Sequence, residues 1–161
     1  MDYTPPPPEI PVAIHEEVVK GTGVTKACFE ELSGVFNVPK PFAMAYLLTE
    51  RGAPGEYVSN TNGSRDGGPM QVNEINWPEL QNKFGINPED LVKDPCLNFG
   101  AGLYFVRSHI DLALEQDRIK TWDDLFHVLA RYNSKTKSVN LNYQEKFIPN
   151  LLTAMEVYSF E

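Results

Sequence analysis

Apolar residues recur at helical spacing in several stretches of the chain after residue 25. In 25–36 they approximate one helical face, and 40–50 combines a proline suited to a first helical turn with an almost continuous apolar run. Thr121 and Asp124 have the spacing of a helix N-terminal capping box. Together these patterns predict helices at 25–36, 40–50, 76–84, 98–115, 121–132 and 143–158. Pro149 is expected to kink or split the last of them.

The stretch 51–66 has a different character, because it is rich in glycine, proline and asparagine. Its Asn62-Gly63 pair is typical of a tight turn and favours a short β-hairpin. The stretch 85–95 is predicted to be a loop. The expected fold is therefore a mostly α-helical domain with one small loop or β-hairpin insertion.

Length and composition fit one globular domain. The chain has 161 residues, of which 42% are hydrophobic. Its formal net charge of −8 argues against general binding to nucleic acid or to anionic membranes, which basic patches favour. The sequence contains no apolar run of about 18 residues, so no transmembrane helix is predicted. We expect a monomer.

Residues 1–11 are expected to be a proline-rich arm outside the folded domain, which we place at 12–161. The run Pro5-Pro6-Pro7-Pro8 favours polyproline II and supplies no donors for a helix or sheet. A spacer is the commoner use of such a sequence, and a ligand for a proline-binding partner is the alternative. No signal peptide opens the chain, so for a secreted protein we expect that segment to be absent from this sequence.

Cys28 and Cys96 are the two cysteines of the chain. They form no CxxC pair and no histidine or cysteine cluster lies beside them in the sequence, so no metal site is predicted. From the residues alone, a long-range disulfide and two buried thiols are about equally plausible. A bridge closing so long a loop would stabilise the fold by roughly 4 kcal/mol in the chain-entropy model, and it would require an oxidising compartment.

Glu50 is the carboxylate with the most unusual position. It ends the apolar segment 40–50 and precedes the glycine- and asparagine-rich stretch, a composition typical of a cleft wall. Partial burial would raise its pKa and keep it protonated near neutral pH, as a general acid requires. The alternative is an exposed glutamate at a helix end.

Two further stretches carry candidate binding groups. In 66–73, two glycines allow a ligand to approach the backbone, and Gln71 and Asn73 alternate with apolar residues. Tyr132 and Asn133 follow one another at the end of a predicted helix. An aromatic ring beside an amide suits a sugar ring, but a core tyrosine next to a helix-capping asparagine explains the pair equally well.

These features occur in one order along the chain: Glu50, the loop 60–66, Gly68-Pro69-Met70-Gln71-Val72-Asn73, Asp94-Pro95-Cys96 and Tyr132-Asn133. In this order they resemble the lysozyme-like lytic transglycosylase (SLT) family, in particular its small members associated with type IV secretion and conjugation systems. The resemblance covers about residues 25–143. Each motif alone is weak, whereas the ordered set is specific.

The resemblance implies a goose-type lysozyme-like α fold that cleaves the β-1,4 bond between N-acetylmuramic acid and N-acetylglucosamine in peptidoglycan. It implies that Glu50 is the catalytic acid and base, and we expect no metal and no cofactor. Cysteines placed like Cys28 and Cys96 pair in such proteins, which implies a disulfide and a periplasmic or cell-envelope location. We expect the substrate to be bound in a cleft beside the glutamate by Gly68, Met70, Gln71, Asn73, Tyr132, Asn133 and Tyr143.

In the implied reaction, the acetamido oxygen of the muramic acid supports the developing oxocarbenium charge. Glu50 protonates the leaving oxygen and then takes a proton from the muramyl 6-hydroxyl, which closes a 1,6-anhydro ring. One alternative is a hydrolytic muramidase with Asp66 as a second carboxylate, although an aspartate that only stabilises its turn is the simpler interpretation. Another is a non-catalytic peptidoglycan-binding subunit of a secretion apparatus, whose components could bind the N-terminal arm.

Three stretches of the sequence depart from the family pattern. Arg51 stands where the family usually has serine, Pro69 stands where it has leucine, and 131–135 reads Arg-Tyr-Asn-Ser-Lys in place of Ala-Tyr-Asn-Ala-Gly. A cation beside Glu50 would favour the ionised carboxylate and lower its pKa, unless the Arg51 guanidinium points to solvent. Pro69 removes one backbone donor that the substrate or the fold could have used.

Overall fold

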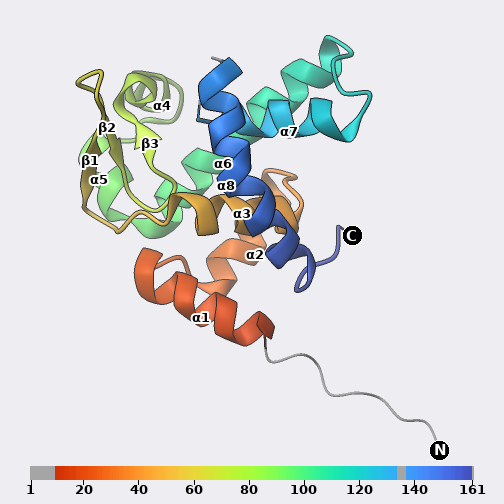
Figure 1. The fold of residues 1–161 in the computed structure, drawn as a ribbon. Coiled ribbons are helices and arrows are strands. Elements are labelled where there is room, and N and C mark those ends of the chain that lie inside the picture. Colours follow the sequence, from red (N-terminus) through yellow and green to blue (C-terminus); the bar gives the residue numbers. More distant parts are fainter. Residues whose placement is uncertain (1–9, 134–136, 161) are drawn as a thin grey trace, which may run out of the picture.

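The computed structural model describes residues 10–133 and 137–160, so most of the proline-rich arm lies outside the described residues. The described chain is mostly helical with one small three-stranded antiparallel sheet, which confirms the predicted fold class and is consistent with a lysozyme-like fold (Figure 1). Its elements are α1 (Ile10–Thr22), α2 (Lys26–Val35), α3 (Lys40–Glu50), β1 (Tyr57–Ser59), β2 (Arg65–Gly67), β3 (Val72–Asn73), the 3-10 turn η1 (Glu74–Asn76), α4 (Trp77–Phe84), α5 (Pro88–Lys93), α6 (Pro95–Glu115), α7 (Trp122–Ala130) and α8 (Lys137–Met155).

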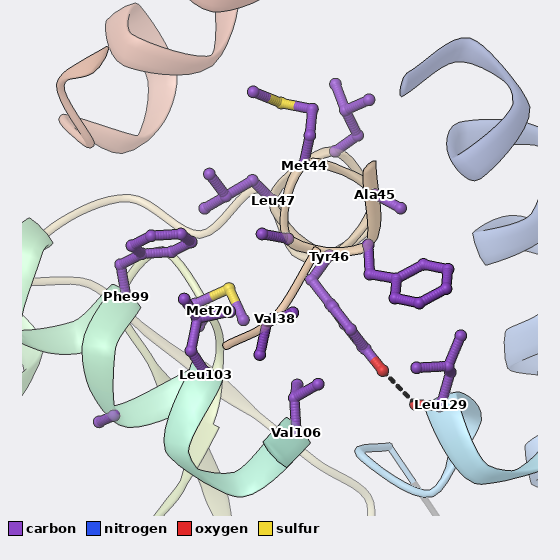
Figure 2. Close-up of a cluster of buried hydrophobic side chains, with 14 of the residues drawn as sticks. Val38, Met44, Ala45, Tyr46, Leu47, Met70, Phe99, Leu103, Val106 and Leu129 are labelled. Carbon is purple, nitrogen blue, oxygen red and sulfur yellow. Dashed lines mark hydrogen bonds between the residues drawn. The ribbon is translucent and has the colours of Figure 1, made fainter. Parts of the chain in front are cut away.

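Helix α3 is the centre of the hydrophobic core. All its residues from Pro41 to Leu48 are buried, as expected of a helix that is apolar on every side. Helix α8 packs along α3, and side chains of α6, α7 and the β2–β3 turn close around it (Figures 1 and 2). The Tyr46 hydroxyl donates to the Leu129 carbonyl oxygen at 2.5 Å, which satisfies the phenol inside the core.

The small sheet lies with α4 and α5 at the C-terminal end of α3 (Figure 1). Its strands pair in the order β1-β2-β3, with Val58 opposite Asp66 and Gly67 opposite Val72. The predicted hairpin is confirmed, and the Asn62-Gly63 turn joins β1 to β2. The sheet is therefore a short insertion that ends beside the last turn of α3.

A disulfide joins Cys28 of α2 to Cys96 in the first turn of α6, across 68 positions of sequence. The pairing that the resemblance implies is thus present, and it is consistent with an extracytoplasmic location. Among the described residues, none of the helices combines the length and the hydrophobicity that a membrane span requires.

Two helices appear where none was predicted. Helix α1 begins at Ile10, within the expected arm, and it buries Val18. Helix α5 replaces the loop expected in 85–95: the Asn87 side chain accepts from the Glu89 N–H, Pro88 occupies the first turn, and buried Leu91 anchors the segment. Six residues are too few to display a helical period in the sequence.

Helix α8 also differs from its prediction. It begins at Lys137, earlier than expected, and it continues through Pro149 without a break. Pro149 removes one backbone donor and its ring crowds the carbonyl group four residues earlier, but Phe147, Leu151 and Ala154 are buried where α8 packs along α3. Tertiary packing therefore holds the helix together across the proline.

Candidate active site

Glu50 is the last residue of α3, and its carboxyl group lies at the junction of α3 and α8. Arg51 ends the helix in a left-handed conformation, with a φ of 44°. The Tyr143 hydroxyl, from α8, donates to the Glu50 Oε1 at 2.7 Å. Glu50 remains partly exposed, so a ligand can reach it, while Tyr143 is buried.

The surroundings of Glu50 favour the protonated form of its carboxyl group. Burial raises its pKa from 4.5 to about 7. The hydrogen bond from Tyr143 and the charge of Lys146 act in the opposite direction, and the charge of Asp66 adds to the increase. Both protonation states of Glu50 are therefore accessible near neutral pH, as an acid that later acts as a base requires.

The guanidinium group of Arg51 pairs with Glu17 and not with Glu50. Its Nη1 lies 2.7 Å from Glu17 Oε1 on α1, and its Nε donates to the Leu48 carbonyl oxygen at 3.1 Å. It is absent from the charges that shift the pKa of Glu50. The departure from serine at this position is thus compatible with a protonated Glu50, because α1 supplies a partner for the guanidinium.

The turn 68–71 lies against the chain that follows α3. The N–H of Gly52 donates to the Pro69 carbonyl oxygen at 3.1 Å, and a Cβ on Gly52 would lie 1.8 Å from the Gly68 carbonyl oxygen. Gly68 has a φ of 74°, and a Cβ there would lie 2.3 Å from Asn98 Nδ2. Glycine at both positions is what allows these backbones to approach so closely.

Asn98 holds this turn in place, and sequence reasoning missed it. It is fully buried in α6. Its Oδ1 accepts from the Met70 N–H at 2.7 Å, and its Nδ2 donates to the carbonyl oxygens of Gly67 and Leu91 at 2.9 and 3.0 Å. A lone amide within the apolar start of a long helix is the sequence signal that could have identified it, since buried polar groups are almost always bonded.

Met70, which was predicted to bind the substrate, belongs to the hydrophobic core. It is fully buried, and it packs so closely on α6 that a Cβ on Gly102 would lie 2.7 Å from its side chain. It contributes to the site through its backbone, because its carbonyl oxygen accepts from the Tyr132 hydroxyl at 2.5 Å. The ring of Tyr132 in turn contacts that of Tyr46 edge to face, 5.2 Å between centroids.

The other predicted residues occupy two settings. Gln71 and Asn73 are both partly exposed; Gln71 donates to the Gly68 carbonyl oxygen at 3.0 Å, and Asn73 Nδ2 donates to Asp66 Oδ1 at 2.8 Å. Asn133 is exposed just beyond α7. Glu50, Tyr143, Tyr132 and Asp66 form one electrostatic group, because the charges of Glu50 and Asp66 both contribute, after burial, to raising the pKa of Tyr132.

The described residues contain no group of three histidine, cysteine, aspartate or glutamate side chains placed to hold a metal ion. What the arrangement offers is proton transfer by one carboxyl group, with hydroxyl and amide groups near it.

Comparison with known proteins identifies several whose sequences are similar to this chain. No protein-family model matches the chain. Invasion protein IagB of Salmonella typhimurium is 24% identical over 121 residues, which cover 74% of this chain and 69% of IagB. Protein IpgF of Shigella flexneri is 32% identical over 72 residues, 44% of this chain and 47% of IpgF. The X polypeptide of Escherichia coli is 32% identical over 91 residues, 56% of this chain and 46% of that protein.

The chain is a distant homologue of these three proteins. The resemblance drawn from the ordered motifs is confirmed at that level. For IpgF and the X polypeptide, the match spans just under half of the relative's length.

Proposed function

We propose that this protein is a peptidoglycan lytic transglycosylase that cleaves the β-1,4 bond between N-acetylmuramic acid and N-acetylglucosamine and forms a 1,6-anhydromuramyl product. The observation that carries the proposal is Glu50 itself. A rigid buried helix presents its carboxyl group, burial raises its pKa to about 7, and Tyr143 donates to one of its oxygens. The distant homology and the ordered motifs support the substrate class.

Glu50 serves first as the acid and then as the base. In its protonated form it donates to the glycosidic oxygen as the bond to the muramic acid breaks. It is then a carboxylate, which the Tyr143 hydroxyl stabilises by a hydrogen bond. That carboxylate takes the proton of the muramyl 6-hydroxyl, whose oxygen attacks the anomeric carbon and closes the anhydro ring, so no water is consumed.

The proposal needs only one carboxylate, because the acetamido oxygen of the sugar supports the positive charge that develops at the anomeric carbon. Asp66 then acts on Glu50 through its charge, which raises the pKa of Glu50. The bond from Asn73 holds Asp66 within β2. A hydrolytic muramidase with Asp66 as the second carboxylate is the competing function, favoured by that same electrostatic contact, and it differs in leaving a reducing sugar end.

We propose that the sugar bound at Glu50 contacts the side chains of Gln71, Asn73 and Asn133, with Gly68 and Tyr132 shaping the backbone behind them. Glycan strands in the cell envelope are the expected partner, and the catalytic unit is residues 12–161. Secretion or conjugation components are candidate partners for the proline-rich arm. The names of the relatives, an invasion protein among them, are compatible with such a setting.

The test is the clearing of purified cell-wall suspensions by the native chain and by Glu50→Gln. We expect Glu50→Gln to lose at least about 100-fold in rate, the lower range for removing a general acid. Glu79→Gln, the same change on an exposed residue of α4, is the matched control and should clear as the native chain does. Equal clearing by Glu50→Gln would show that Glu50 is not catalytic. Binding without clearing by native protein would favour a non-catalytic subunit.

A further inference from the structure

A cavity of about 520 Å³ lies in a part of the molecule that the reaction above does not use. It lies between the 117–120 segment that joins α6 to α7, helix α7 itself, and Asn140 of α8. The side chains that matter here are Arg118, Lys120 and Arg131, all of which line it. A concentration of cations is unexpected in a chain with a net charge of −8.

Arg118 carries hydrogen-bonding capacity that the described protein does not use. Its Nε and Nη2 are buried and have no hydrogen-bond partner in the described structure. These two nitrogens form one edge of the guanidinium, the edge that binds both oxygens of a carboxylate in a bidentate pair. Buried donors without partners are rare and unfavourable. Because neither nitrogen holds a bond, turning this edge toward the cavity breaks none.

The acidic residues at the cavity do not neutralise this edge. Asp124 Oδ2 accepts from the backbone N–H groups of Lys120 and Thr121, at 3.0 and 3.1 Å, and so caps α7. Asp117 is exposed and pairs with Lys120 at 3.6 Å. Arg131 is instead opposed by Arg118: after burial, the Arg118 charge is the second cause that lowers the pKa of Arg131. An anion between the two guanidinium groups would relieve that repulsion.

We propose that the cavity lined by Arg118 and Arg131 is a binding site for a carboxylate of the peptide stem that peptidoglycan carries on its muramic acid. The source of the carboxylate rests on the proposed function. Position supports it: Arg131 directly precedes Tyr132, and Asn140 lies three residues, about one helical turn, before Tyr143, the residue bonded to Glu50. The cavity and the tyrosines of the proposed active site are therefore built on the same two stretches of chain, the end of α7 and the start of α8. The planar fork of arginine can bind a carboxylate through two parallel hydrogen bonds.

Isothermal titration of the full chain with two soluble probes tests this proposal. The first is muramyl-L-alanyl-D-glutamate, and the second is the same compound with both glutamate carboxylates converted to amides. Neither contains the β-1,4 bond, so binding is measured whether or not the protein cleaves glycan. We expect the acid to bind at least about tenfold more tightly than the amide, and Arg118→Gln and Arg131→Gln to abolish that preference. The matched control is Arg107→Gln, the same change at an arginine of α6 that pairs with Asp111 and does not line the cavity, and it should keep the preference.

The outcomes separate this site from the catalytic claim. Equal binding of acid and amide by the native chain, or an unchanged preference in Arg131→Gln, overturns the site even if the protein cleaves peptidoglycan. Tight binding of inorganic phosphate at Arg118 and Arg131, with no preference for the acid probe, overturns the peptide stem as its ligand. A preference that depends on both arginines supports the site even if no cleavage is found. If Arg118→Gln fails to fold, Arg131→Gln and the two probes on the native chain still decide.

Discussion

The middle and the C-terminal end of helix α3 are built on opposite principles. In the middle, eight successive residues are buried, and the one polar side chain among them, Tyr46, donates to Leu129 (Figure 2). At the end, Glu50 places an ionisable carboxyl group in surroundings that raise its pKa to about 7, and Arg51 adopts a left-handed backbone. The middle of the helix thus stabilises the fold, whereas its end holds a group that is unfavourable when ionised.

The packed middle of α3 holds the carboxyl group at its end in place. Packing on every side fixes the axis of α3, so the position of its last residue is set by the core and not by a mobile loop. We therefore predict that substitutions in the middle of α3 lower the stability of the fold without altering the catalytic reaction. Substitutions at Glu50 should alter the reaction and can increase stability.

Leu47→Ala tests the middle and should have the largest effect on stability. Leu47 is fully buried, so we expect a loss of about 3 kcal/mol from the free energy of unfolding, by removal of apolar contacts and creation of a cavity. Denaturant unfolding measures it. Leu152→Ala, the same change at a leucine that is 58% exposed on α8, is the matched control and should change stability by less than about 0.5 kcal/mol. A similar loss in both variants would contradict the contrast.

Glu50→Gln should change stability in the opposite direction, and only at higher pH. The folded state holds the proton up to a pKa of about 7 and the unfolded state only up to about 4.5, so ionisation destabilises the fold increasingly between these values. Removing the carboxylate should therefore stabilise the protein by on the order of 3 kcal/mol above pH 7 and by little below about pH 4.5. Unfolding curves across this range measure it. A gain that is the same at every pH would contradict the raised pKa.

Tyr143→Phe and Asp66→Asn should move the pKa of Glu50 in opposite directions. The Tyr143 hydrogen bond lowers this pKa and the Asp66 charge raises it. Because the acid must be protonated, the alkaline limb of the rate profile should shift to higher pH in Tyr143→Phe and to lower pH in Asp66→Asn. The rate of cell-wall clearing as a function of pH measures the shift of this limb in each variant. Shifts in the same direction would show that the two groups do not act on Glu50 as the geometry indicates.

Glu17→Ala should have the smallest effect, a modest shift of the same limb to lower pH. It frees the Arg51 guanidinium, which can then approach Glu50 and favour its ionised form. The double variant with Arg51→Ser, the residue usual in the resembled family, should remove the shift. A limb that does not move in the single variant would mean that the bond to the Leu48 carbonyl oxygen alone keeps Arg51 away.

The sequence predicts those parts of the molecule that depend on local signals. The bounds of α3 follow from Pro41 and the apolar run, and the capping box of Thr121 and Asp124 is present as predicted. Helix α5 was not predicted, because it depends on two buried residues and a helix cap. The sequence did not predict that α8 continues through Pro149, because this continuity depends on packing against α3.

The same division holds for the site. Glu50 was identifiable because it ends an apolar run next to a glycine-rich stretch. The bond from Tyr143 spans 93 positions, and the direction of Arg51 depends on Glu17, in a helix that the pattern did not predict. Asn98 was missed because its partners are backbone atoms far from it in sequence. Contacts between distant segments are what the sequence pattern could not supply.

The most direct test of the central claim is mass spectrometry of the muropeptides that the native protein releases from purified peptidoglycan in water labelled with heavy oxygen. If Glu50 directs the muramyl 6-hydroxyl onto the anomeric carbon, the products end in 1,6-anhydromuramic acid, are lighter by one water than the hydrolysis products, and carry no label. Products with a reducing end that contains labelled oxygen would contradict the transglycosylase and identify a hydrolase.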